Sequence, residues 1–148
     1  MEATKKDEII KLSFPKSAVF SSIPRTTIQA IGDRLRLSED QIADLKLAVG
    51  EACTNAIKFG DEGSAEVCVL YKIRNDSIEI QVRNSGQPFI VPNPPKNEAT
   101  IAELREGGLG LFLISNLMDE ISIECAFGET AVTMVKRLDP DSCLHSTN

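Results

Sequence analysis

Two side chains near the middle of the chain have the types and the spacing for carboxylate and metal chemistry. Glu51 and Asn55 lie four residues apart in the run GEACTNAIKFG, so they share one face of a helix, away from its apolar stripe. A carboxylate can take a proton from a hydroxyl group, and an amide oxygen is a hard ligand that suits Mg²⁺. A solvated helix face explains the same pair without a ligand, and the pair alone leaves both interpretations open.

The run NSGQPF, residues 84–89, follows a predicted strand and is a second candidate position. A glycine just past the end of a strand, here Gly86, lets a flat ligand approach the backbone closely. Asn, Ser and Gly also form plain turns, and a turn explains this run equally well when it is taken alone.

The run EGGLGLFLISNLMD, residues 106–119, opens a predicted helix with three glycines. The free N–H groups and the dipole at such a helix start favour an anion such as phosphate. No Gly-Lys-Ser/Thr follows, and Leu113 stands in place of the third glycine of a dinucleotide fingerprint, so neither a P-loop nor a Rossmann motif is complete. An ordinary glycine-rich helix start is the alternative interpretation.

The composition excludes several other chemistries. The 148 residues, 42% of them hydrophobic, suit one globular domain. The net charge of -6 argues against general binding to nucleic acids. His145 is the only histidine, which leaves no plausible Ser-His-Asp or Cys-His centre. The cysteines have no C-x-x-C spacing, and we expect them to be small core residues in a reducing compartment: Cys53, Cys68, Cys125 and Cys143.

No apolar run approaches the ~20 residues that a membrane-spanning helix needs, and the first residues, MEATKKDE, contain no hydrophobic signal segment. We therefore expect a cytoplasmic protein. Residues 1–8 and 139–148 are polar and are expected to be flexible ends, with a single domain over residues 9–138.

The elements that must position the candidate residues can be predicted from the hydrophobic pattern. Residues 9–14 form a strand before Pro15, and residues 17–37 are helical. Pro24 either begins the regular helix or bends it. Ser38 and Gln41 form a capping-box signature for a helix over residues 39–59.

The second half of the chain is predicted to contain two hairpins separated by a long loop and a helix. Alternating apolar residues predict the first hairpin, which turns at Asn75-Asp76. Residues 84–108 form the loop, with one helical turn near 99–105. The remaining elements are a helix over 108–118 and strands over 120–126 and 130–137. This order predicts a two-layer α+β sandwich, with helices on one face of a mixed, mostly antiparallel sheet.

Three of these runs occur in the order of one known nucleotide site. The sequence over about residues 9–137 resembles the GHKL ATPase superfamily (the Bergerat fold), and within it the bacterial anti-sigma factor serine kinases of the RsbW and SpoIIAB type. The run at 51–56 is similar to the N-box, and NSG at 84–86 is similar to the first glycine box. GGLGLFLISNLMDEI at 107–121 is similar to the second glycine box and the segment after it.

The resemblance implies a role for each matched residue. Glu51 would be the general base that deprotonates or positions a serine hydroxyl, and Asn55 would coordinate Mg²⁺. Gly86 would let the adenine of ATP approach. Backbone N–H groups of the second glycine box would contact the phosphates, from Gly107, Gly108, Leu109 and Gly110.

Residues 91–107 would form a mobile lid over the nucleotide, and the charge and position of Arg105 suggest that it reaches the phosphates. The family usually has Asp where this chain has Asn84, and that Asp accepts a hydrogen bond from the adenine amino group. The amide oxygen of Asn84 can accept the same bond without charge assistance. The expected consequence is weaker nucleotide binding or relaxed base selectivity.

The resemblance implies an ATP- and Mg²⁺-dependent protein serine/threonine kinase that is also an anti-sigma factor. Its substrate would be a STAS-domain anti-sigma factor antagonist, and its second partner would be a sigma factor. The protein would be a homodimer, and it would bind neither nucleic acid nor membrane directly. A binding-only regulator with poor nucleotide affinity is the alternative. The catalytic domain of a histidine kinase fits less well, because the only histidine lies in the tail.

Overall fold

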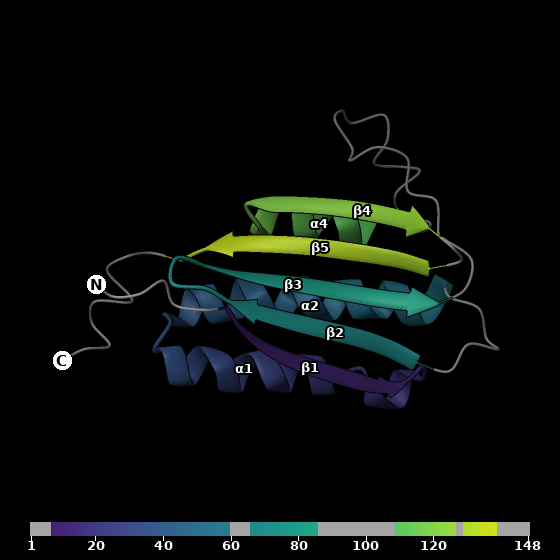
Figure 1. Cartoon of the computed structure of the whole chain (residues 1–148), viewed down its shortest axis with the longest axis horizontal. Helices are drawn as coiled ribbons and strands as arrows, with labels where there is room; N and C mark the ends of the chain where they lie inside the picture. Colours follow the sequence, from purple (N-terminus) through teal and green to yellow (C-terminus); the bar gives the residue numbers. More distant parts are fainter. Residues whose placement is uncertain (1–6, 60–65, 86–108, 127–128, 139–148) are drawn as a thin grey trace.

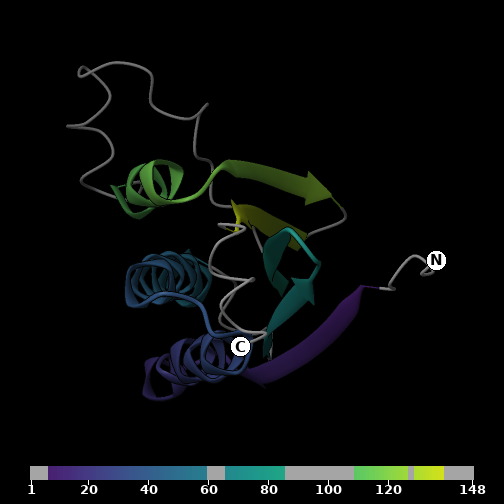
Figure 2. The same cartoon turned by 90° about the vertical axis from the view of Figure 1, so that its left-hand side faces the viewer.

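The computed structural model describes residues 7–59, 66–85, 109–126 and 129–138 (Figure 1). These residues form two layers, a five-stranded sheet and three α-helices that cover one of its faces, as the view along the layers shows (Figure 2). The predicted α+β sandwich with helices on one face is therefore confirmed.

The sheet has the strand order β1-β2-β3-β5-β4, and all four of its described pairings are antiparallel. The sheet is thus antiparallel in all its described pairings, where the sequence predicted a mixed, mostly antiparallel sheet. The difference arises because the strands of each predicted hairpin pair with each other, and the connection through α4 returns the chain so that β5 runs opposite to β3. In chain order the elements are β1 (Glu8–Pro15), η1 (Ala18–Phe20), α1 (Ile23–Leu35), α2 (Glu39–Phe59), β2 (Glu66–Ile73), β3 (Ser77–Ser85), α4 (Leu109–Leu117), β4 (Glu120–Ala126) and β5 (Glu129–Arg137).

Pro24 begins the first long helix and does not bend it. It lies in the first turn of α1, where the missing N–H of proline costs no hydrogen bond. The helical residues before it form only the single turn η1, whose start is capped by Ser17. Helix α1 ends at Arg36, which takes the left-handed conformation with φ 58°.

The capping box at the start of α2 is present as predicted. The backbone N–H of Gln41 donates to the hydroxyl of Ser38 over 3.1 Å, and the N–H of Ser38 donates to the side-chain oxygen of Gln41 over 3.3 Å. Both predicted ends of this helix, Glu39 and Phe59, agree with the structure. A motif that is local in sequence therefore fixes the start of the helix that carries Glu51 and Asn55.

The core lies between the helices and the inner face of the sheet. Tyr71 is its largest fully buried side chain, and the Tyr71 hydroxyl donates to the backbone oxygen of Pro24 over 2.8 Å, which ties β2 to α1. Burial raises the pKa of Tyr71, and so does the nearby Cys53. Cys53 is a core residue as predicted, but the prediction was wrong for Cys68, which the alternation along β2 places on the solvent side of the sheet. The side chains of the other two cysteines lie outside the described residues.

Gly32 allows α1 and α2 to approach closely. A Cβ at this position would lie 2.6 Å from Cγ1 of Ile42, a buried branched side chain. We expect Gly32→Ala to lower the free energy of unfolding by about 1–2 kcal/mol, since overpacking exceeds the gain in helix propensity.

Gly50→Ala is the matched control for this prediction. Its Cβ would meet Cδ of Arg25 at 2.9 Å, and Arg25 is a flexible side chain that can move away. Urea denaturation of both variants makes the comparison, and a Gly32→Ala variant as stable as Gly50→Ala would contradict the prediction.

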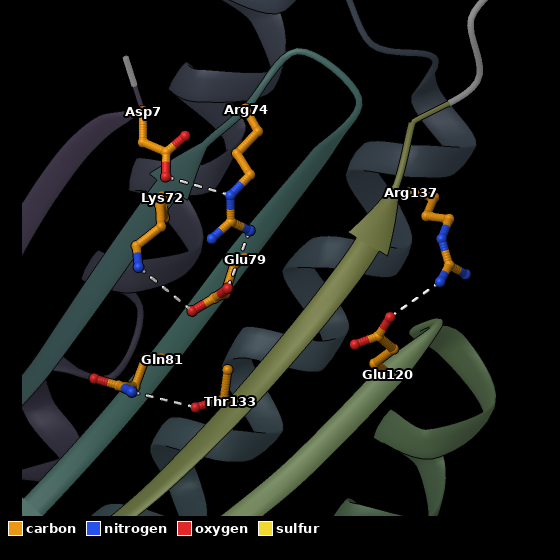
Figure 3. Close-up of polar contacts among 8 residues, drawn as sticks. All are labelled: Asp7, Lys72, Arg74, Glu79, Gln81, Glu120, Thr133 and Arg137. Carbon is orange, nitrogen blue, oxygen red and sulfur yellow. Dashed lines mark hydrogen bonds and ion pairs between the residues drawn. The ribbon is translucent and has the colours of Figure 1, made fainter. Parts of the chain in front are cut away.

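The face of the sheet that carries no helices is polar. Figure 3 shows ion pairs from Arg74 to Asp7 and Glu79 and from Lys72 to Glu79, and a second group in which Arg137 pairs with Glu120. A hydrogen bond joins Gln81 to Thr133 across β3 and β5. These side chains are partly exposed, so this face is a solvated surface. Surface pairs of this kind stabilise a protein little. Among the described residues, no helix is both long and apolar enough to cross a membrane.

Candidate functional site

The candidate residues of three elements meet at one end of the molecule. The C-terminal part of α2, the end of β3 and the start of α4 lie on the right-hand side in Figure 1. Helix α4 packs beside α2 and runs in the opposite direction, so its first residues lie at this end (Figure 1).

Asn55 is buried with an unpaired donor. Its side chain is only 7% exposed, and its Nδ2 has no hydrogen-bond partner within the described parts of the chain. A buried amide without a partner is costly, so a solvated helix face does not explain this residue. Glu51, one turn earlier on the same helix, is half-buried. On this face of α2 the polar side chain of Asn55 is thus more buried than that of Glu51, as expected for a ligand site.

Asn84 lies inside β3, whereas the sequence placed it in the turn after the strand. The strand continues to Ser85 because Asn84 pairs on both sides, with Val67 of β2 and Thr130 of β5. Its side chain is 2% exposed, and its Nδ2 donates to the backbone oxygen of Ala56 over 3.0 Å. This bond joins the sheet to α2 next to Asn55, and it orients the side-chain oxygen of Asn84 as an acceptor.

Thr130 is a site residue that the sequence analysis missed. It lies directly across from Asn84 in the β3–β5 pairing and is 1% exposed. The signal was available, because alternation along β5 puts Thr130 on the same inner face as Val132 and Met134. A polar side chain at a buried strand position beside Asn84 adds a hydroxyl to this part of the site.

The structure describes the glycine-rich segment only from Leu109 onward. Leu109 and Gly110 begin α4, one residue after the predicted start. Gly86, Arg105, Gly107 and Gly108, which the sequence analysis assigned to the adenine and the phosphates, lie outside the described residues. Ile114 of α4 and Met118 just after it are buried, so this helix packs its apolar side into the core.

Cys53 belongs to the core and not to the site, although it lies between Glu51 and Asn55 in sequence. Burial raises the pKa of the Cys53 thiol to about 12, against the opposing charge of Arg25. The thiol is therefore protonated at neutral pH and is no nucleophile. No group of three or more His, Cys, Asp or Glu side chains able to hold a metal ion occurs in the described ranges.

A separate hollow of about 550 Å³ lies between α1 and α2. The Lys46 ammonium in it donates to the side-chain oxygen of Gln29 over 3.0 Å. None of Glu51, Asn55 and Asn84 lines this hollow, so it is distinct from the candidate site. Its lining residues are Ser22, Arg25, Thr26, Gln29, Ala43, Lys46 and Leu47.

The fold resembles two solved structures. One contains the RsbU and RsbW domains of Rv1364c from Mycobacterium tuberculosis, with a TM-score of 0.66 and 18% identity over 88% of this chain and 32% of that chain. The other is the SiaB-SiaC complex from Pseudomonas aeruginosa, with a TM-score of 0.60 and 15% identity over 85% of this chain and 88% of that one. Both likenesses concern the fold.

The model of the histidine kinase-like ATPase domain matches residues 22–136. The chain and its fold are thus those of a histidine kinase-like ATPase domain. The serine-protein kinase RsbW of Bacillus velezensis is 35% identical over 95% of this chain and 92% of its own, and that of Bacillus subtilis is 33% identical over the same shares. The chain belongs to the RsbW serine-protein kinase family.

Proposed function

We propose that this protein is an ATP-dependent serine/threonine kinase that phosphorylates a STAS-domain anti-sigma factor antagonist and sequesters a sigma factor. The observation that carries the proposal is the buried side chain of Asn55 with its unpaired Nδ2 donor, on the same helix face as Glu51 and beside the Asn84–Ala56 hydrogen bond. Family membership supports the same activity, since the relatives are named serine-protein kinases.

The residues present fit a nucleotide with a bound Mg²⁺. The amide oxygen of Asn55 is a hard ligand that suits Mg²⁺. Its buried Nδ2 has no partner among the described residues and needs an acceptor, which a phosphate oxygen of the nucleotide would supply. Asn84 offers an acceptor for the adenine amino group. The free N–H groups at the start of α4 favour binding of an anion such as phosphate. When bound, Mg²⁺ would neutralise charge on the phosphates.

Phosphoryl transfer requires positioning and charge stabilisation more than covalent chemistry. Glu51 would accept the proton of the substrate hydroxyl, and Asn55 would hold the cation four residues further along the same helix face. Residues Leu109 and Gly110 would orient the phosphates through their backbone. Gly86, Arg105, Gly107 and Gly108 are proposed to complete the site as the family resemblance implies.

The partners follow from the same resemblance. The unphosphorylated antagonist would compete with the sigma factor for this protein, and phosphorylation would end the competition. We propose a homodimer in the cytoplasm as the working assembly, with no direct contact to nucleic acid or membrane.

A binding-only regulator is the second candidate, and Asn84 favours it. A neutral amide replaces the usual carboxylate as the acceptor, and hydrogen bonds to charged acceptors are roughly twice as strong. Such a protein would sequester its partner without turnover.

Incubation with Mg-ATP and a STAS-domain protein encoded near this one separates the two candidates. We expect phosphate on one serine or threonine of that protein, detected by mass spectrometry, and nucleotide binding detected by calorimetry. Nucleotide binding too weak to detect, with the STAS-domain protein still bound, would favour the binding-only regulator.

A further inference from the structure

Lys136 joins three elements at the end of the molecule opposite Asn84. It projects from the inner face of β5, and its ammonium donates to the backbone oxygen of Leu117, the last residue of α4, over 2.7 Å. The same ammonium lies 3.3 Å from a carboxylate oxygen of Asp44 on α2. The Lys136 side chain is 17% exposed, so solvent screens these interactions less than those of a surface pair.

The C-terminal end of α4 is fixed to β5 by further bonds. The N–H of Asp119 donates to the backbone oxygen of Val135 over 2.8 Å, and the N–H of Arg137 donates to the Asp119 carboxylate over 2.6 Å. A cation at the end of a helix is also favoured by the helix dipole. This end of α4 is therefore an anchored end, and Lys136 links it to Asp44 of α2.

Asp44 lies on the same face of α2 as the candidate site. Glu51 and Asn55 follow it by 7 and 11 residues, which at about 100° per residue places all three within about 20° of one line along the helix. The start of α4 is 8 residues before Leu117, or about 12 Å, which is close to the distance from Asp44 to Glu51 along α2. Helix α4 runs opposite to α2 (Figure 1). Fixing Leu117 beside Asp44 therefore brings Leu109 and Gly110 alongside Glu51 and Asn55.

We infer that Lys136 is a positioning residue, which sets α4 against the site face of α2 and so aligns the first N–H groups of α4 with Asn55. This inference rests on the proposed function, in which a nucleotide contacts both helices. In that case the nucleotide would connect α2 and α4 at the start of α4, and Lys136 connects them at the end of α4. Each connection favours the other, because coupling between two sites is reciprocal.

Lys136→Met tests the inference, since it removes the ammonium and keeps much of the side-chain volume. We expect the Kd for Mg-ADP and the KM for Mg-ATP to rise about tenfold, a coupling of ordinary size, while kcat at saturating ATP stays within about twofold. Lys136→Arg keeps a charged donor and should restore most of the affinity. Asp44→Asn removes the ion pair and keeps the bond to Leu117, so its effect should lie between those of the wild type and Lys136→Met.

Lys72→Met is the matched control, because Lys72 also pairs with a carboxylate but lies on the solvent face of the sheet. Hydrogen exchange of the α4 amides without nucleotide gives a second reading, and faster exchange is expected in Lys136→Met alone. Unchanged exchange together with unchanged Kd would overturn the inference while leaving the kinase proposal intact. A wild type that binds no nucleotide would overturn the kinase proposal, and the exchange data would still decide whether Lys136 sets α4. Should Lys136→Met fail to fold, the same readings on Asp44→Asn against the wild type decide the inference.

Discussion

Glu51→Gln is expected to lower kcat for phosphorylation of the antagonist by about 10²–10⁴-fold, the usual contribution of a general base. The amide keeps the size of the side chain on the half-buried face of α2 but cannot take the proton of the substrate hydroxyl. Nucleotide affinity should change little, because Glu51 is assigned to the hydroxyl and Asn55 to the cation. Single-turnover phosphorylation with calorimetric Mg-ADP binding measures the two effects separately.

Glu124→Gln is the matched control for this experiment. Glu124 is an exposed carboxylate on β4, and its replacement should leave kcat unchanged. A Glu51→Gln variant that phosphorylates at the wild-type rate would remove Glu51 from the mechanism. An equal fall in both variants would indicate a general effect of charge.

Asn84→Asp is expected to lower the free energy of unfolding by about 3 kcal/mol near pH 8, because it places a charged group in a buried position. The Nδ2 donor to the Ala56 oxygen is lost, and a carboxylate would face that carbonyl oxygen at a position that is 2% exposed. The sequence alone suggested that a carboxylate here would strengthen adenine binding. The hydrogen bond to Ala56 shows that the same change also breaks a link between the sheet and α2.

The pH dependence of this variant provides the decisive measurement. Burial and the facing carbonyl should raise the pKa of the introduced carboxyl in the folded state, since only the protonated form can donate to Ala56. A group whose pKa is raised by folding contributes its stability below the unfolded pKa and loses it as pH rises through the folded pKa. Asn84→Asp should therefore lose stability relative to the wild type between pH 5 and 8, whereas Asn84→Ala should show a loss independent of pH. Thermal unfolding of both variants across this range makes the test, and a pH-independent Asn84→Asp would contradict it.

The parts of the fold that could be predicted are those that local sequence determines. The capping box of Ser38 and Gln41 joins residues three apart, so both ends of α2 were predicted correctly. Alternation along the strands predicted both hairpins, but Cys68 was expected in the core because of its residue type, and it lies on the exposed face of the sheet. The candidate site was predicted as three separate runs on the chain.

What could not be predicted depends on pairing between distant residues. Asn84 has the local sequence of a turn, but Val67 and Thr130 pair with it on both sides and extend the strand. The bond from Asn84 to Ala56 spans 28 residues and follows from the packing of α2 on β3. The burial of Asn55 likewise depends on which elements surround the end of α2, whereas helical periodicity alone placed it off the apolar stripe and left a solvated face and a ligand site both open.

The position of β1 in the sheet has a consequence for how the protein is made. β1 pairs only with β2 in the described sheet, and its residues are 51 to 65 positions away from their partners along the chain. At a synthesis rate of about 5–20 residues per second, the ribosome needs roughly 3–13 s to add the residues between them. Helices α1 and α2 can form and pack in that time, since local contacts form fastest. Until β2 is made, β1 is an unpaired strand whose apolar residues include Ile9 and Ile10, so this segment can pair with other chains during synthesis.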